Sequence, residues 1–392
     1  MAVDGYEYYG LGDLYCVATG AALLGSGGGG CFEDALVVLK SMSGWSGAVP
    51  VGPYDGKTAA CSLAMMGSPD AATGLSLDDI RHSYTNALSA LGPAIGCEPG
   101  CFVPGEIGAI NSLVPLIAAW ERGLWVVDGD GAGRAVPELP QTTLAAAVNL
   151  PAAPCALGND AADSALIETA IINAPSAARV ESLAGGVVAA FGSFAGMALW
   201  SSTADNQFAL AGNYIPGTLE QTRALGKFLL GTATPPSTGQ VVQMLSATTG
   251  RAASVAVPNF YVTQVTQATS SASLDAGVIR LDNTPDPAQS SVTCYLYNLN
   301  ENLIAYASTS AVPLIVAPDS ICYYSEDTGR GFSNASNDLA VYYDFTNGRS
   351  TGKRVSVIKL SAAAQLCAAP GVLDSFATLL RQIGYAGVLP GG

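Results

Sequence analysis

Charged residues are scarce in this chain of 392 amino acids: only 12% are Asp, Glu, Lys or Arg, against roughly 25% in an average globular protein. Apolar residues make up 49%, which argues against disorder and allows sizeable hydrophobic cores. The few charges are unbalanced, with 16 basic and 31 acidic residues and a formal net charge of −15. Such a surface repels phosphate backbones and anionic membranes, so we expect neither nucleic acid nor a membrane as a partner.

Zinc ligands are scarce as well. Histidine occurs once, at His82, and of the nine cysteines only Cys97 and Cys101 are close in sequence. A Cys/His zinc site is therefore disfavoured. The odd cysteine count and an acidic N-terminal region without a signal-peptide pattern favour free thiols and a cytoplasmic protein. The apolar run from Leu14 to Leu24 is too short to span a membrane.

The first half of the chain alternates between helical and strand periodicity. Apolar runs predict buried strands at 59–66, closed by Gly67-Ser68-Pro69, and at 124–128. Ser76, followed by an acidic turn, predicts the N-cap of a helix that Gly92-Pro93 should stop. We predict further helices at 13–24, 32–42, 111–120, 179–190 and 219–230. Strands that alternate with helices indicate an α/β domain, which we place at 1–238.

The composition changes after Thr232. The stretch 234–239 is typical of a linker, and Thr, Ser, Val, Tyr and Asn dominate beyond it. Residues 260–266, 291–297 and 339–343 have strand character, with turns at 282–285 and 346–348. We therefore predict a β-rich C-terminal domain at 239–392 with a partly helical tail.

A run of four glycines, Gly27, Gly28, Gly29 and Gly30, follows the first predicted helix. Glycines let the backbone approach a ligand and turn its N–H groups inward, which favours a pocket for an anion or a carbonyl. The alternative is a flexible turn between two helices. Cys31 comes next, at a predicted helix start where its thiolate would be stabilised.

The segment 128–138 brings Asp128, Asp130, Arg134 and Glu138 to the end of an apolar strand, where ligands of α/β sheets bind. Two carboxylates two residues apart on a strand point the same way, and close like charges raise one pKa, as a general base requires. The alternative is an acidic surface turn in which Arg134 pairs with a neighbour.

Glu106 and Asn111 flank a predicted helix entrance. Asn111 is either the helix N-cap or a donor to a substrate carbonyl, and Glu106 is either a base or a carboxylate near a helix N-terminus.

These segments resemble, in order, the motifs of the S-methyl thiohydantoin desulfurase family. The similar stretches are 20–30, 66–69, 106–112 with 115–116, 127–139, 215–219, 300–305 and 316–321. The resemblance implies a five-membered cyclic ureide, or its sulfur analogue, as substrate. It also implies hydrolytic desulfuration to a hydantoin, with a homo-oligomer or a hydantoinase-type partner as possible assemblies.

Desulfuration needs a base for water and donors for the ring. We predict Asp128 or Asp130 as the base, with Arg134 and Asn111 orienting the ring. Ser26 and the backbone N–H groups of Gly27, Gly28, Gly29 and Gly30 would form a polar cradle.

Glu106 and Glu138 would orient these groups. No organic cofactor is required, and a divalent metal such as magnesium or manganese would be held by Glu106, Asp128 and Asp130. The alternatives are another cyclic-amide or lactam hydrolysis or isomerisation, and a non-catalytic small-molecule-binding or partner subunit.

Overall fold

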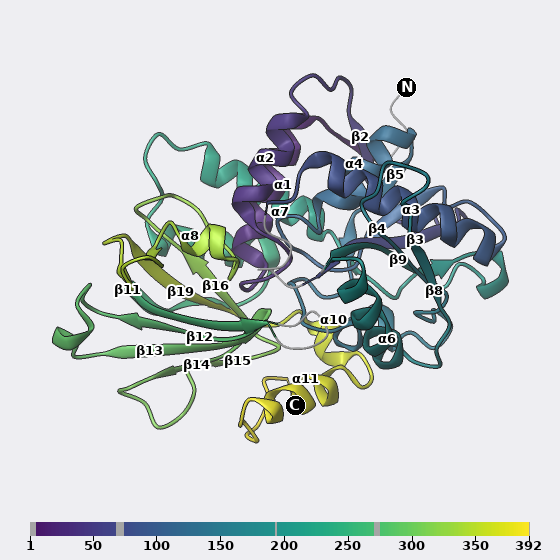
Figure 1. The fold of residues 1–392 in the computed structure, drawn as a ribbon. Coiled ribbons are helices and arrows are strands. Elements are labelled where there is room, and N and C mark those ends of the chain that lie inside the picture. The colour runs from purple at the N-terminus through teal and green to yellow at the C-terminus, as the bar shows by residue number, and fades with distance from the viewer. Residues whose placement is uncertain (1–4, 68–73, 193, 270–274, 392) are drawn as a thin grey trace.

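Two sheets of different kinds organise the chain, one in each half (Figure 1). The computed structural model describes residues 5–67, 74–192, 194–269 and 275–391. An N-terminal α/β domain is followed by a C-terminal β-rich domain with a helical tail, as predicted.

The first sheet is mixed. Its eight strands lie in the order β1 (Glu7–Tyr9), β2 (Val49–Gly52), β5 (Trp125–Val127), β4 (Cys101–Pro104), β3 (Ala60–Gly67), β9 (Phe194–Ser202), β7 (Cys155–Gly158) and β8 (Thr169–Ile172). The four strands β2, β5, β4 and β3 are parallel, and the pairs on either side of them are antiparallel. Alternate residues of β3 enter two cores, Leu63 and Met65 on one face and Ala64 and Met66 on the other. Burial on both faces explains why this strand is a continuous apolar run.

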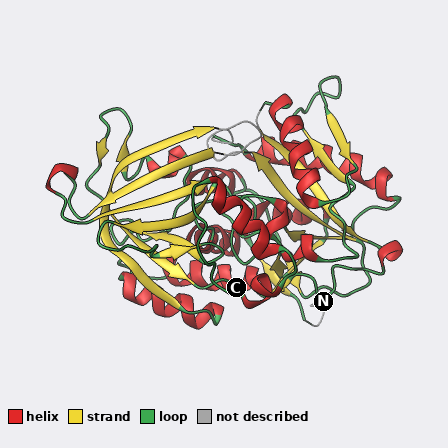
Figure 2. Ribbon diagram, turned by 90° about the horizontal axis from the view of Figure 1, so that it is seen from below, coloured by secondary structure: helices red, strands yellow, loops and turns green. Residues whose placement is uncertain are grey.

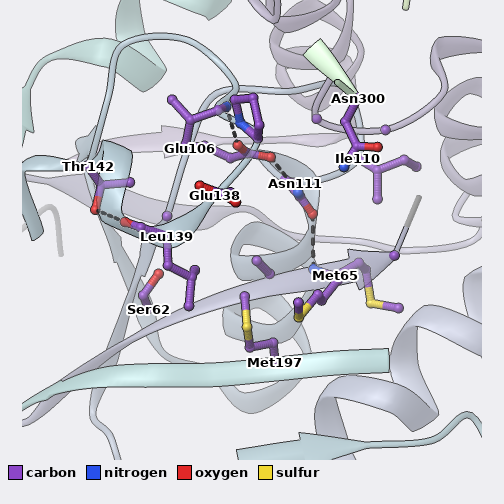
Figure 3. A pocket seen from close by; sticks show the side chains of 18 of the residues that line it. Ser62, Met65, Glu106, Ile110, Asn111, Glu138, Leu139, Thr142, Met197 and Asn300 are labelled. Carbon is purple, nitrogen blue, oxygen red and sulfur yellow. Dashed lines mark hydrogen bonds between the residues drawn. The ribbon is translucent and has the colours of Figure 1, made fainter. Parts of the chain in front are cut away.

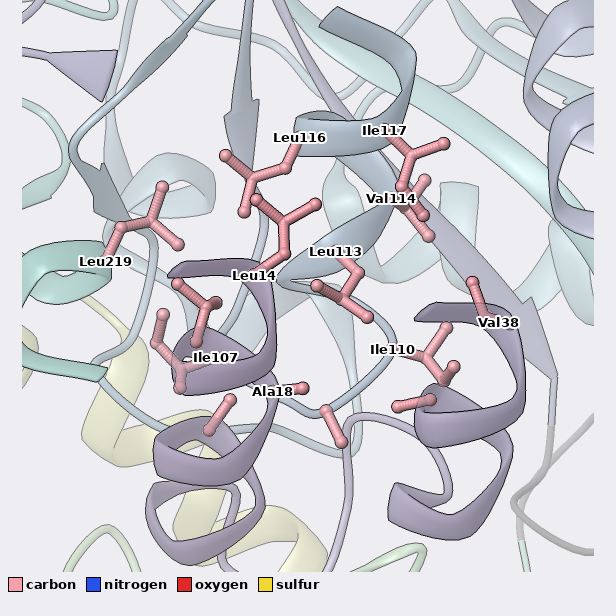
Figure 4. Packing of buried hydrophobic residues seen from close by; sticks show 14 of the residues in the cluster. Leu14, Ala18, Val38, Ile107, Ile110, Leu113, Val114, Leu116, Ile117 and Leu219 are labelled. Atoms are coloured by element: carbon pink, nitrogen blue, oxygen red, sulfur yellow. The ribbon is translucent and has the colours of Figure 1, made fainter. Parts of the chain in front are cut away.

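Helices cover both faces of this sheet. One core is built with α1 (Leu11–Leu24), α2 (Phe32–Ser41), α3 (Leu77–Ile95), α4 (Leu113–Arg122) and α7 (Thr218–Leu230), and Figure 4 shows part of it. The opposite core is closed by α6 (Ala177–Ala190), η1 (Leu139–Gln141) and α5 (Thr143–Ala146). Helices α1 and α7 cross at glycines: a Cβ on Gly20 or Gly226 would collide with the backbone of the other helix. This close packing ties residues 218–230 to the N-terminal domain.

The second sheet is antiparallel and strongly curved. Its seven strands lie in the order β15 (Ile315–Val316), β14 (Glu301–Ala307), β13 (Thr293–Leu299), β12 (Asp275–Asp282), β11 (Ala253–Thr269), β19 (Arg354–Leu360) and β16 (Ser320–Tyr324). The edge strands β15 and β16 contact each other, so the sheet almost closes into a barrel. The tail helices α10 (Ala364–Ala368) and α11 (Val372–Gln382) lie below the junction of the two domains in Figure 1 and pack against residues of both. Figure 2 shows the two sheets from below.

Two short two-stranded sheets complete the structure. β6 (Gly129–Asp130) pairs with β10 (Ile215–Pro216), and β17 (Tyr343–Asp344) pairs with β18 (Arg349–Ser350). All nine cysteines lie within the described residues and are free. Among the described residues, no helix is both long and apolar enough to cross a membrane.

The six predicted helices and both predicted strands of the first half are present, and Ser76 caps α3 through a bond from the Asp79 N–H. Of the turn that should close β3, Ser68 and Pro69 lie outside the described residues. Pro93 does not stop α3, which continues to Ile95 and ends at Gly96 in the left-handed region (φ 71°). A proline near a helix end gives up only one of its last hydrogen bonds.

Two predictions for the second half were wrong. Residues 339–343 do not form a strand, because α9 (Ser336–Leu339) and a turn occupy most of them and bury Tyr342 against Phe332. The stretch after 238 opens with a helix, α8 (Thr238–Thr249), not with β structure. A capping box of Ser237 and Gln240 starts this helix.

Candidate functional site

The glycine run passes between the two domains. Ser26 Oγ accepts a bond from the Ile321 N–H (2.9 Å), and the Ser26 carbonyl accepts one from the Asn302 N–H (2.8 Å). The Gly27 carbonyl accepts the Asn334 N–H (2.7 Å). Ser26 and Gly27 therefore join the first domain to the second and do not line the cavity described below.

The other glycines allow close approach. A Cβ on Gly28 would overlap the Glu301 carboxyl, and a Cβ on Gly29 or Gly30 would overlap Gly108 or Ile110. The run is thus a tightly packed seam, not a flexible turn. Gly29 and Gly30 line the cavity, where they pack against Gly108 and Ile110.

A cavity opens beside this seam, between the end of β3, the 105–111 and 136–142 segments, β9, α6 and the turn before β14. Its volume is about 110 Å³, enough for several waters, since one needs roughly 10–15 Å³. Four carboxyl groups line it, from Glu106, Glu138, Glu181 and Glu301. No lysine, arginine or histidine occurs among its described lining residues.

Glu106 and Asn111 form a fixed pair in the cavity wall (Figure 3). Asn111 Nδ2 donates to Glu106 Oε1 (2.7 Å), and Asn111 Oδ1 accepts the Met65 N–H (3.0 Å). The Val136 N–H donates to Glu106 Oε2 (2.7 Å). Burial raises the pKa of Glu106 to about 7, although these two donors favour the ionised form. Asn111 is not the N-cap of α4, a position that Ser112 takes.

Glu138 and Glu181 differ in their partners. The Leu139 N–H donates to Glu181 Oε2 (3.0 Å), and burial, helped by the nearby Glu138 and Glu106 charges, raises the pKa of Glu181 to about 7. The Glu138 carboxyl has no hydrogen-bond donor among the described residues, and burial alone raises its pKa. Figure 3 shows this carboxyl between Glu106 and Leu139. A partly buried carboxyl without protein donors is available to a water or a ligand.

The opposite wall is apolar. Met65, Met66 and Met197 line it, and Figure 3 shows Met65 and Met197 facing the side that holds Glu106 and Glu138. Thioether side chains are polarisable and adapt to irregular apolar groups. The cavity therefore presents acidic groups to one side of a ligand and a soft apolar surface to the other.

Three buried polar atoms of the described lining residues have no hydrogen-bond partner, and one of them is Glu301 Oε2. Trp200 Nε1 and Ser62 Oγ form no hydrogen bond, although their residues are 1% and 0% exposed. Trp200 also has a left-handed backbone (φ 48°) within β9. Unpaired buried polar groups and backbone strain cost stability and cluster at functional sites.

The structure places Asp128 and Asp130 elsewhere. Asp128 Oδ1 accepts the N–H groups of Leu219 and Glu220 (3.0 and 3.1 Å) and so caps α7. Asp130 is fully buried and accepts the N–H groups of Ala132 and Gly133 in its own turn. Burial raises the pKa of Asp130 to about 7. Neither residue lines the cavity, because the Asp128 carboxylate binds the start of α7 and the Asp130 carboxylate binds the backbone of its own turn.

Arg134 is also held away from the cavity and is not exposed. Its guanidinium donates to four backbone carbonyls, those of Ala135, Asn302, Pro318 and Asp319, at 2.8–3.1 Å. Three of these belong to the C-terminal domain. Arg134 therefore joins the domains, and its guanidinium is directed at backbone carbonyls instead of into the cavity or at a surface carboxylate.

The predicted metal ligands do not come together. Glu106 lines the cavity, whereas Asp128 and Asp130 bind separate backbone segments. Within the described ranges, no group of three His, Cys, Asp or Glu side chains has the arrangement of a metal site.

Cys31 lines the cavity but has no stabilised thiolate. Its Sγ donates to Asp338 Oδ1 (3.2 Å), and the Asp338 carboxylate also accepts the N–H groups of Phe32 and Glu33 at the start of α2. Burial and the neighbouring carboxylates raise the pKa of the Cys31 thiol far above its usual value. The Asp338 carboxylate therefore accepts the N–H groups at the start of α2 that would otherwise stabilise a Cys31 thiolate.

Of the residues that the sequence singled out, Glu106, Glu138, Asn111, Gly29, Gly30 and Cys31 line the cavity, whereas Ser62, Glu181, Trp200 and Glu301 are among the lining residues that were not predicted. Ser62 and Trp200 lie within apolar strands. Their polar atoms point to a function only because they have no hydrogen-bond partner, and this is known only from the structure. Glu301 lies in one of the stretches that resemble the family motifs, but the sequence did not indicate that its side chain enters the cavity.

Comparisons with known proteins agree with this architecture. Two sequence-family models, described as the S-Me-THD-like N-terminal domain and the S-Me-THD-like C-terminal domain, match residues 12–169 and 175–373. No curated protein matches the sequence. The crystal structure of a protein from Chromobacterium violaceum is similar, with 27% sequence identity and a TM-score of 0.80 over 98% of this chain and 99% of that one. The two family models together span most of the chain, which therefore belongs to the S-Me-THD-like family, the thiohydantoin desulfurase-like family whose motifs it resembles.

Proposed function

We propose that this protein is a hydrolase that removes the sulfur substituent from an S-methylated thiohydantoin ring in the cavity between its domains. The observation that carries the proposal is the composition of that cavity, with four carboxyl groups, a methionine wall and no basic side chain among its described lining residues. The family to which the chain belongs supplies the substrate class.

The carboxyl groups suit acid–base chemistry on an uncharged ring. Burial raises the pKa of all four, so protonated and ionised carboxyls coexist near neutral pH. An anionic substrate would meet only like charges. A cyclic ureide instead offers N–H groups to carboxylates and a carbonyl to donors.

Glu138 is the base of the proposed reaction, because its carboxyl has no protein donor and is partly exposed in the cavity. It takes a proton from water, and the water oxygen bonds to the ring carbon between the two nitrogens. The carbon–sulfur bond then breaks. Methanethiol leaves with the proton that Glu138 held. The second proton of the water passes to the ring nitrogen of the former C=N bond, and the ring carbon keeps the oxygen as the carbonyl of a hydantoin.

The remaining lining groups orient the ring. Asn111 has a second Nδ2–H beyond the one bonded to Glu106, and Trp200 Nε1 is an unused donor, so both suit a ring carbonyl. The S-methyl group would lie against Met65, Met66 and Met197. The proposal uses groups of this chain alone.

Methanethiol release from a 5-alkyl S-methyl thiohydantoin tests the proposal. We expect turnover by the wild-type protein and a loss of about 10²–10⁴-fold in Glu138→Gln, the usual contribution of a general base. Glu168→Gln, an exposed glutamate outside the cavity, is the matched control and should keep the wild-type rate. Ring opening without methanethiol would favour the cyclic-amide hydrolase alternative. Tight binding without any turnover would favour the binding-protein alternative.

A further inference from the structure

Glu301 is the one lining carboxyl that the C-terminal domain contributes, from the first residue of β14. It is 4% exposed, and its carboxyl packs against the Cα of Gly28. Oε2 of this carboxyl has no hydrogen-bond partner. An unpaired oxygen on a buried carboxyl is costly when the group is ionised and is ready to bind when it is protonated.

Among the described residues, Glu106 and Arg134 are the charged groups that act most strongly on Glu301, and neither neutralises it. The Glu106 carboxyl repels a negative charge there, and both of its oxygens already accept hydrogen bonds. Arg134 attracts a negative charge, but its donors are bonded to four backbone carbonyls and it forms no ion pair with Glu301. Burial and the Glu106 charge outweigh the attraction of Arg134 and raise the pKa of Glu301 well above its usual range.

The carboxyls reach the cavity from different parts of the fold. The charge of Glu106 acts on both Glu301 and Glu181. Glu138 belongs to the 136–142 segment of the first domain, whereas Glu301 enters from the start of β14 in the second domain. Their surroundings differ, since Glu138 is partly exposed in the cavity and Glu301 is buried. Such a difference separates an acid from a base.

We propose that Glu301 is the general acid of the site and donates the proton of its carboxyl to a ring nitrogen of the bound substrate. The inference rests on the proposed function and adds a catalytic group supplied by the second domain. Activity therefore requires that the two domains remain packed together at the glycine run.

The proton balance closes without another reactant. Glu301 protonates the ring nitrogen of the C=N bond while Glu138 takes a proton from the attacking water, and the carbon then bears both hydroxyl and S-methyl groups. As the carbon–sulfur bond breaks, Glu138 returns its proton to the departing sulfur. The hydroxyl gives its proton to Glu301 and becomes the carbonyl, so both carboxyls regain their starting states.

Glu301→Gln tests the proposal, because it keeps the volume and removes the transferable proton. In the wild-type protein, kcat/KM should fall at high pH as Glu301 ionises. In Glu301→Gln that alkaline decline should disappear, and the rate at neutral pH should fall about 10²–10⁴-fold. Asp319→Asn removes a buried carboxylate near Arg134 but outside the cavity, so its pH profile should match that of the wild type.

Infrared difference spectra give a readout that needs no turnover. The C=O stretch of a protonated carboxylic acid should be present at neutral pH in the wild-type and Asp319→Asn proteins and reduced in Glu301→Gln. An unchanged band, or an unchanged alkaline decline of the rate, would overturn the assignment of Glu301. A reduced band in a protein that releases no methanethiol would instead reject the proposed function and retain Glu301 as a held proton donor.

Discussion

Replacement of Arg134 by methionine should uncouple the two domains. The change removes the donors of four buried carbonyls, three of them in the C-terminal domain. Each unsatisfied carbonyl costs roughly 1–3 kcal/mol. Two effects reduce this cost in the variant. Water can reach some of the carbonyls, and the variant no longer has to bury a charged guanidinium. We therefore expect a net loss of about 3–5 kcal/mol, near the low end of the cost of four carbonyls at roughly 1–3 kcal/mol each.

Urea unfolding followed by two probes measures this loss. All four tryptophans (residues 45, 120, 125 and 200) lie in the N-terminal domain, so their fluorescence reports on that domain, whereas far-ultraviolet circular dichroism reports on both. In Arg134→Met the two transitions should separate and move to lower urea. Arg179→Met, an exposed arginine without an ion pair, is the control and should unfold like the wild type. Equal unfolding of the two variants would refute the role given to Arg134.

Three further outcomes follow from the site. Gly28→Ala should destabilise the protein because its Cβ would overlap a carboxyl, whereas Gly12→Ala, with open space in α1, should be neutral or stabilising by up to about 1 kcal/mol in thermal unfolding. Ser62→Ala should stabilise the ligand-free protein, since its hydroxyl has no partner, yet weaken hydantoin binding in calorimetry; weaker stability would contradict this. The folded state raises the pKa of Glu106 and Glu181 to about 7, so it holds protons that the unfolded chain releases. The free energy of unfolding should therefore decrease as the pH rises from about 5 to 7, and the decrease should be smaller in Glu181→Gln.

Local signals in the sequence were sufficient for the six predicted helices and for strands β3 and β5 of the first half, but the other six strands of its sheet were not predicted. The Ser76 cap, the apolar run of β3 and the helical spacing of α1 each depend on neighbours in sequence, and each is present. The helix at Thr238–Thr249 had such a signal too, the capping box of Ser237 and Gln240, which the Thr- and Ser-rich composition obscured. The 339–343 segment could not be predicted locally, because Tyr342 is buried in a turn by stacking on Phe332.

The site was only partly predictable for a similar reason. Glu106 and Glu138 lie beside recognisable turns, and both reach the cavity. Asp130 and Arg134 have the same local appearance, but their partners decide their roles: Asp130 closes its own turn, and Arg134 binds carbonyls far away in sequence. Glu301 enters the cavity from the other domain, a contact that no spacing reveals.

Isotope incorporation tests the central claim most directly. The wild-type protein is incubated in ¹⁸O-labelled water with an S-methyl thiohydantoin, and the products are analysed by mass spectrometry. We expect one ¹⁸O atom in the hydantoin carbonyl for each methanethiol released, at a rate that Glu138→Gln reduces about 10²–10⁴-fold. Absence of labelled hydantoin, or labelling by Glu138→Gln at the wild-type rate, would contradict hydrolytic desulfuration in this cavity.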